Sequence, residues 1–352
     1  MYIVIAIVVF GILIASHELG HFTVAKLCGV RVNEYAIGMG PTLLKKQGKE
    51  TLYSLRLLPI GGFCAMEGED EDTGDPRAFS TQRRWKKLLI LAAGATMNFL
   101  FGLIVVAILF AGSQGFVGNT VVELAEGFPY SGEQGINEGD QIYSINGHRI
   151  YYSSDFSTFM ALDGDGTVDL VIKRDGQKIH LEGFELKPRE YTDNGQTVVR
   201  YGLTFNVIPA TLGSKIAHTW RETMNFVRLI WISLGQLITG KVGLRDMSGV
   251  VGIVSTVNDV GQSAASFGSA IWSIAYLFAF IAVNLAVMNM LPIPALDGGR
   301  IFFMIVTAVI ERIIGHKLNP KYEGYIHTAG LVLLMGLMAV IMISDVVKIF
   351  NG

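Results

Sequence analysis

The chain has 352 residues, of which 51% are hydrophobic and only 16% are charged. Soluble domains carry roughly 25% charged residues, so this composition excludes an ordinary soluble protein and indicates an integral membrane protein. The formal net charge is -2, and no block of Lys and Arg indicates nucleic-acid binding. Cys28 and Cys64 are the only cysteines, which excludes a disulfide framework.

The first segment, from Tyr2 to about Leu27, is apolar and longer than the roughly 20 residues that a membrane span needs. It lacks a basic start and a small-residue cleavage site, so we expect a retained span rather than a signal peptide. Near its end stand His17, Glu18 and His21, in the sequence HELGH. Histidines four residues apart share one helix face and can hold zinc, with Glu18 beside them to activate a metal-bound water. Ionisable groups are costly in a membrane, which favours a functional site over histidines that merely pack.

The segment between the first two spans is expected to form a small β-structure at the membrane surface. Residues 53–57 alternate like a strand, and glycines and prolines at 38–41 and 59–62 punctuate the segment.

Three further segments are long enough to span: Leu88–Ala111, about Ala270–Leu291 and about Tyr325–Phe350. Ile301–Ile314 is apolar but too short, and is expected to be a re-entrant or interfacial helix. Between the first two spans lie ten Lys and Arg residues, and four more lie at 300–321. The positive-inside rule therefore places both segments in the cytoplasm, and both termini and the central region outside.

The central region, predicted as a domain over 113–209, regains charged and turn residues. Short β-branched runs and a hairpin turn at Arg174–Gln177 predict one compact, mainly β domain with a short helix at Asp155–Leu162. It is followed by Leu212–Leu237, which is apolar on one face and charged on the other. We expect this segment, within a connector over 210–269, to be an amphipathic helix at the membrane surface.

A third metal ligand is needed, because a catalytic zinc takes three protein ligands and leaves one position open. Asp297 is the best candidate, since it follows the third predicted span in a stretch broken by prolines and glycines (residues 289–299). The alternative is that Asp297 caps the following helix.

The chain resembles the site-2 protease family of intramembrane zinc metalloproteases, in particular the PDZ-containing bacterial RseP/RasP-type group. The resemblance is carried by HELGH at 17–21 and by motifs at 59–63, 94–98, 249–253 and 289–299. Residues 135–147 resemble the turn and strand of a single PDZ module. Ala95 and Val250 stand where the family often has proline.

This resemblance implies a polytopic α-helical membrane protein of the bacterial cytoplasmic membrane, with an extracytoplasmic PDZ domain and the site toward the cytoplasmic half. His17, His21 and Asp297 would hold Zn²⁺, and Glu18 would be the general base. Substrates would be single-span membrane proteins such as pre-cleaved anti-sigma factors or remnant signal peptides. The PDZ module would bind a peptide or protein ligand.

Substrate contacts are expected from two places. Asn289 and Asn284, in the third span, are candidate donors to substrate backbone or to the tetrahedral intermediate, or else hold helices together. The β-structure offers an edge for an unwound substrate strand; its candidate residues are Gly38, Gly40, Tyr53, Ser54 and Leu55. Two other functions remain open: a zinc-binding membrane transporter, and a non-catalytic PDZ scaffold.

Overall fold

The computed structural model describes residues 1–69, 73–163, 166–193, 196–243, 249–316 and 320–351. These residues form two compact units, one of residues 1–109 with 226–352 and one of residues 110–225. The division falls within two helices, α2 (Arg84–Ala111) and α4 (Leu212–Ile238). Each unit is described by itself.

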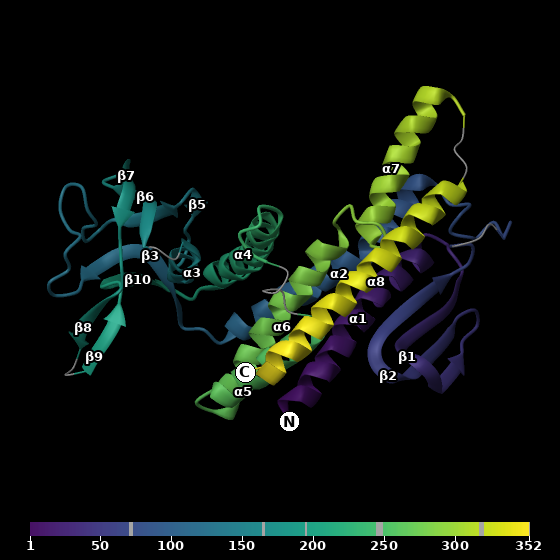
Figure 1. The fold of residues 1–352 in the computed structure, drawn as a ribbon, viewed down its shortest axis with the longest axis horizontal. Coiled ribbons are helices and arrows are strands. Elements are labelled where there is room, and N and C mark those ends of the chain that lie inside the picture. The colour runs from purple at the N-terminus through teal and green to yellow at the C-terminus, as the bar shows by residue number, and fades with distance from the viewer. Residues whose placement is uncertain (70–72, 164–165, 194–195, 244–248, 317–319, 352) are drawn as a thin grey trace. The chain divides into compact units, whose positions relative to one another are not determined.

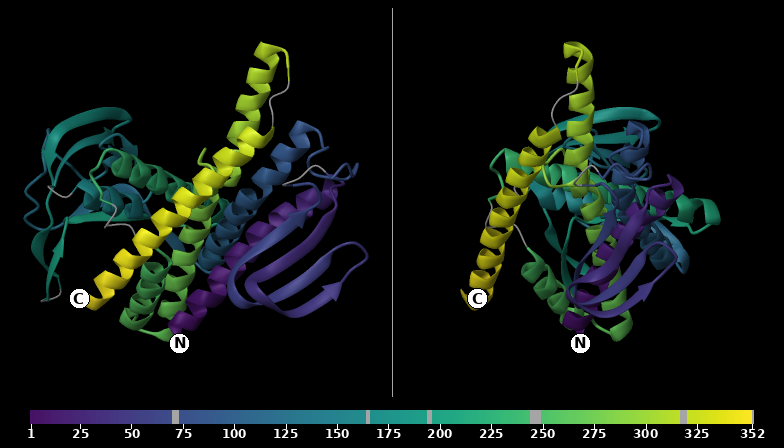
Figure 2. Two further views of the ribbon diagram at one scale, coloured as in Figure 1. Left: turned by 45° about the vertical axis from the view of Figure 1, so that its right-hand side comes forward. Right: turned by 90° about the vertical axis from the view of Figure 1, so that its right-hand side faces the viewer.

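The first unit contains the long apolar helices (Figures 1 and 2). Besides α2, they are α1 (Tyr2–Leu27), α6 (Phe267–Asn289) and α8 (Pro320–Asn351). Among the described residues, four stretches are long and apolar enough to cross a membrane: α1, α2, α6 and Gly324–Asp345 within α8. The four predicted spans are thus helical, with ends that differ by a few residues.

Two shorter helices complete this unit. The helix α7 (Asp297–Ile314) begins four residues before the predicted apolar segment, so that Asp297 is its first residue. The other, α5 (Val250–Ser263), lies where only a connector is predicted. Apolar side chains of α1, α5 and α6 share one buried cluster, which includes Leu13, Val257 and Phe278. That cluster packs α5 into the helical unit.

The β-structure is a two-stranded sheet of β1 (Val32–Gln47) and β2 (Leu52–Met66), which lies against α1 in all views of Figures 1 and 2. Gly38, Gly40 and Gly61 have positive φ, a conformation that glycine adopts without strain. Around them each strand divides into two arms. The pairing order is 62–66, 32–37, 52–56 and 42–47, so the outer arms are 62–66 and 42–47.

This order corrects the predicted substrate edge. Tyr53 pairs with both Tyr35 and Lys46, and Ser54 and Leu55 are likewise paired on both sides. The three residues therefore lie in an inner arm. The prediction that they form a free edge is wrong, because long-range pairing through the bent strands was not visible in the alternation of the sequence.

A second buried cluster fastens the sheet to the helices. Cys64 and Met66 of β2 pack with Ala25 of α1 and with Ile90 and Leu91 of α2. Burial raises the pKa of the Cys64 thiol to about 12, so this cysteine is a packing residue rather than a reactive thiolate. The sheet is thus anchored at the end of α1 that carries the histidines.

The second unit is mainly β, as predicted. Its main sheet has the order β10-β3-β4-β6-β7, with antiparallel neighbours and with β5 paired to β4, while β8 and β9 form a separate hairpin. The strands are β3 (Gly115–Leu124), β4 (Gln141–Ile145), β5 (His148–Arg149), β6 (Thr167–Arg174), β7 (Gln177–Glu185), β8 (Arg189–Asp193), β9 (Gln196–Arg200) and β10 (Leu203–Pro209). The helix α3 (Ser153–Asp163) contains the predicted short helix.

Candidate metal centre

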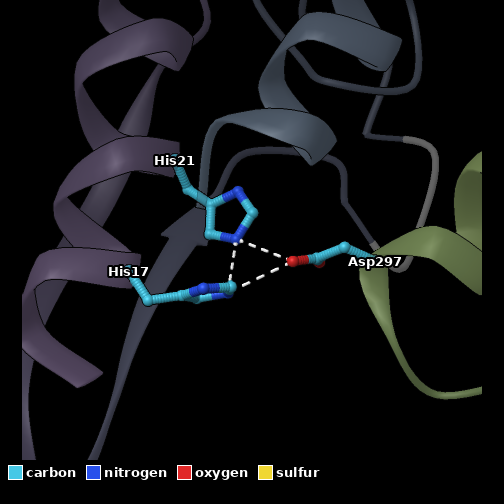
Figure 3. Close-up of side chains that lie close together, drawn as sticks. All are labelled: His17, His21 and Asp297. Atoms are coloured by element: carbon cyan, nitrogen blue, oxygen red, sulfur yellow. Dashed lines mark hydrogen bonds and ion pairs between the residues drawn. The ribbon is translucent and has the colours of Figure 1, made fainter. Parts of the chain in front are cut away.

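The structure brings together the three side chains that the sequence singles out as metal ligands (Figure 3). His17 and His21 project from the same face of α1, and Asp297 reaches them from the start of α7. Asp297 Oδ2 lies 3.1 Å from His17 Nε2 and 3.2 Å from His21 Nε2, and the two Nε2 atoms are 3.1 Å apart. The three atoms form a nearly equilateral triangle.

A tight loop positions Asp297, which is not the N-cap of the following helix. The N-cap of α7 is Leu296, and Asp297 is the first helical residue. In the preceding loop Ala295 has φ +79°, a left-handed conformation that is uncommon outside glycine. A Cβ on Gly298 or Gly299 would lie within 2.5 Å of the backbone of Met290 or Ile293. Glycines there allow the loop to fold onto the first turn of α7, which aims Asp297 at the histidines.

Three observations test whether this triangle fits a zinc ion. For zinc bonds of about 2.0–2.1 Å, neighbouring ligands of a tetrahedral site are separated by about 3.3 Å, close to the observed spacing. Asp297 Oδ2 is buried without a hydrogen bond, facing the two imidazoles. A Cβ on Gly94 of α2 would lie 2.4 Å from His21 Nε2 and 2.7 Å from His17 Nε2, so glycine keeps this space open. The residues present fit zinc.

The orientation of His21 is fixed by α2. Its Nδ1 lies 2.8 Å from the backbone oxygen of Ile90, to which it donates when Nε2 faces a metal. The two helices approach closely there, because a Cβ on Gly20 would lie 2.3 Å from the backbone oxygen of Ala93. Small residues at such contacts let membrane helices meet.

Glu18 is half-buried and lies within electrostatic range of all three members of the triangle. The sheet approaches it closely, since a Cβ on Gly62 would lie 3.4 Å from Glu18 Cγ. Gly62 belongs to an outer arm of the sheet. An edge strand, a carboxylate and the triangle thus share one region of the first unit.

The other predicted site residues, in α6 and β1, are not members of the triangle. Asn284 and Asn289 are both half-buried in α6, but five residues separate them. On a regular helix they point about 140° apart, so at most one faces the site. Gly38 and Gly40 serve as bends of β1, where a Cβ on Gly38 would lie 2.5 Å from the backbone oxygen of Leu58.

Sequence reasoning missed the residues of α2 that surround the histidines. The sequence places Gly94 and Asn98 in the motif at 94–98, and Gly94 among the small residues that let membrane helices approach, but predicts no role for either beside the histidines. Asn98 is buried and lies beside His17 and Ser16. A polar amide and a glycine in an apolar span are visible in the sequence, but what they face is not.

Comparison with known proteins identifies the family. The sequence model of peptidase family M50 matches residues 5–337. The chain belongs to peptidase family M50, the site-2 protease family. Proteins of Clostridium acetobutylicum (38% identity, covering 99% of this chain and 98% of that one) and Clostridium perfringens (36%, 99% of both) carry names that assign them to the zinc metalloproteases. The regulator of sigma-W protease RasP of Bacillus subtilis is 27% identical over 98% of both chains.

These matches extend over nearly the whole chain, and the HELGH segment lies inside the matched region. The chain is a zinc metalloprotease, and its described residues include four candidate membrane-spanning helices and a β domain.

Proposed function

We propose that this zinc metalloprotease cleaves single-span membrane proteins within or near the bilayer, as in regulated intramembrane proteolysis. One observation carries the proposal: the His17–His21–Asp297 triangle takes two of its members from α1, a helix apolar enough to span a membrane. Ionisable residues at such a depth mark functional sites by default. A peptide bond cut there must belong to a chain that reaches the membrane.

In this proposal His17, His21 and Asp297 hold the zinc ion. Bound zinc makes a coordinated water more acidic and polarises the scissile carbonyl. Glu18 follows His17 directly in α1, where its carboxylate accepts a proton from the attacking water and returns it to the leaving amine.

The substrate is proposed to bind as an added strand on arm 62–66 of the sheet. A membrane helix satisfies its own amides and must unwind before a peptide bond can be attacked. Arm 62–66 has a strand partner on one side only among the described residues, and Gly62 lies beside Glu18. A strand added on its free side would be held near the proposed base.

The deciding experiment compares Glu18→Gln with wild type in lipid vesicles that contain a single-span test substrate. We expect cleavage to fall by at least about 100-fold, the low end of general acid–base contributions, while the zinc content stays unchanged. Glu123→Gln, on an exposed position of β3, is the matched control and should cleave normally. Cleavage by Glu18→Gln at the wild-type rate would overturn the proposal. Zinc flux without cleavage in the wild type would identify a transporter instead, and neither activity would favour a scaffold.

The binding arm has its own test. Gly62→Val places methyl groups between the arm and Glu18, and we expect a raised KM for the membrane substrate with zinc still bound. Leu44→Val places a valine at an exposed position of the opposite outer arm and should leave KM unchanged. Equal effects of the two valines would refute a preferred edge.

The second unit is proposed to be the PDZ module, placed outside the cytoplasm by the positive-inside rule. Support comes from its turn before β4, where buried Asp140 accepts two hydrogen bonds from Arg174, at 2.8 and 2.7 Å, and orders the segment of the predicted PDZ signature. Its proposed ligand is the extracytoplasmic part of the substrate. Protease added to intact cells should digest residues 110–225 and spare the 32–66 sheet. The reverse pattern would show that the sheet is outside and the second unit is in the cytoplasm.

A further inference from the structure

Asn98 is a buried amide in the middle of α2, only 1% exposed. Its side chain lies between two polar groups of α1: the amide nitrogen is 3.4 Å from His17 Nδ1, and the amide oxygen is 2.8 Å from Ser16 Oγ. Ser16 Oγ also lies 2.8 Å from the backbone oxygen of Leu13. The oxygen and nitrogen of an amide occupy nearly the same space, so their assignment follows from hydrogen-bond counting.

The contacts of Ser16 allow either orientation of the amide: Ser16 donates to the amide oxygen, or it donates to Leu13 and accepts from the amide nitrogen. A hydroxyl has one proton, and the Leu13 carbonyl is an acceptor only. If Ser16 donates to Leu13, its oxygen must accept from Asn98, which places the amide nitrogen at Ser16. The amide oxygen then faces His17 Nδ1. In this orientation the Ser16 hydroxyl proton meets the backbone oxygen of Leu13, and one amide proton of Asn98 meets Ser16 Oγ.

The count at His17 selects the second orientation, with the amide oxygen toward His17 Nδ1. Its Nε2 faces Asp297 and His21, so a metal held there needs the Nε2 lone pair, and the imidazole proton must sit on Nδ1. Nδ1–H requires an acceptor, which the amide oxygen supplies. The opposite orientation would place an N–H against Nδ1 and move the imidazole proton to Nε2, where it would block the metal.

We propose that Asn98 is a positioning residue that holds His17 in the metal-binding tautomer, with its oxygen toward His17 and its nitrogen toward Ser16. This inference rests on the proposed metal role of His17. It gives the two histidines a common support on α2: His21 donates to the backbone oxygen of Ile90, and His17 to a side chain. Only the second support can be removed by substitution.

The test measures zinc affinity of the solubilised full-length protein by competition with a chelator. Partners of metal-bound histidines are worth about 10–100-fold in affinity, and we expect a loss in that range for Asn98→Leu. Asn98→Asp keeps an acceptor toward Nδ1, with Ser16 turning to donate to it, and should restore affinity toward the wild-type value. The Co²⁺-substituted protein gives a second readout, since its visible spectrum should change in Asn98→Leu and less so in Asn98→Asp.

Two further variants keep the test decisive. Ser16→Ala removes the group that orients the amide without touching His17, and should lower zinc affinity by less than Asn98→Leu. Thr96→Val changes an exposed side chain of the same helix, whose hydroxyl donates to the backbone oxygen of Ala92 in that helix, and should leave affinity unchanged. Wild-type affinity in Asn98→Leu, or equal losses in Asn98→Leu and Asn98→Asp, would overturn the inference. A wild type that binds no zinc would instead overturn the proposed metal site.

Discussion

The helices α2 and α8 are almost equally apolar, yet they pack very differently. In the most apolar stretch of α2, 44% of the residues are buried within the protein, against 6% in α8. Two glycines of α2 meet neighbours closely, Gly94 at the histidines and Gly102 at α6. In α8, Gly330 also meets Pro294 closely, but Gly336 has no protein atom within contact distance among the described residues. Hydropathy is thus similar in the two helices, whereas glycines of α2 let the neighbouring helices approach it closely.

The largest effect should come from Gly94→Ala. The added methyl group would lie within 2.7 Å of both Nε2 atoms, in the space that the proposed metal needs. We expect the zinc content of the purified protein to fall to background and cleavage to be lost, although alanine is a better helix former than glycine. Retention of one zinc per chain by Gly94→Ala would show that the metal lies elsewhere.

A smaller effect is expected for Gly102→Leu, where α2 meets α6. Its Cβ would lie 2.7 Å from Val283 and 3.0 Å from the backbone oxygen of Ala279. Forcing the helices apart should lower the free energy of unfolding by about 1–3 kcal/mol, measured by thermal unfolding in detergent with zinc present. An unchanged transition would mean that α2 and α6 do not depend on close approach.

In the described part of α8, the buried carboxylate of Asp345 makes a strong polar contact. It accepts hydrogen bonds from the backbone N–H groups of Gly249 and Gly252, at 2.8 and 2.9 Å, at the start of α5. In Asp345→Ala these amides lose their acceptor, and we expect faster hydrogen exchange at 249–252 with little change in the unfolding temperature. Equal exchange rates in the variant and wild type would show that Asp345 does not hold the start of α5 in place.

Gly336→Leu should have the smallest effect. Leucine favours helix, and its side chain would enter open space beside the protein. We expect the free energy of unfolding to stay within about 0.5 kcal/mol and cleavage of a membrane substrate to stay normal. Loss of cleavage with normal stability would instead show that this face of α8 meets the substrate.

Much of the fold could be predicted because it depends on local pattern. Length and apolarity identify the four spans, and β-branched runs identify the second unit. The helix α5 was missed, since its 14 residues are too few to span and carry several polar side chains. The free edge was misplaced because the arm order depends on pairing around Gly38 and Gly61, far apart in the sequence.

The candidate site also contains residues that the sequence predicts and one that it does not. His17 and His21 could be found because their spacing encodes a shared helix face, Glu18 because it stands beside them in HELGH, and Asp297 because a carboxylate beside a broken span is conspicuous. The role of Asn98 could not be read from the sequence. Its contact with His17 joins residues 81 positions apart, and no spacing rule predicts which face of α2 meets α1.

The proposed ligands lie far apart along the chain, so the ribosome synthesises them at different times. Between His21 and Asp297 lie 275 residues (297 − 21 − 1). Ribosomes add about 5–20 residues per second, so roughly 14–55 seconds pass between the histidine pair and its carboxylate. During that interval the first two spans can enter the bilayer while the protease lacks its third ligand. With this proposed ligand set, a nascent chain is inert beside the unfinished membrane proteins at the insertion site and gains its activity only when its own later helices arrive.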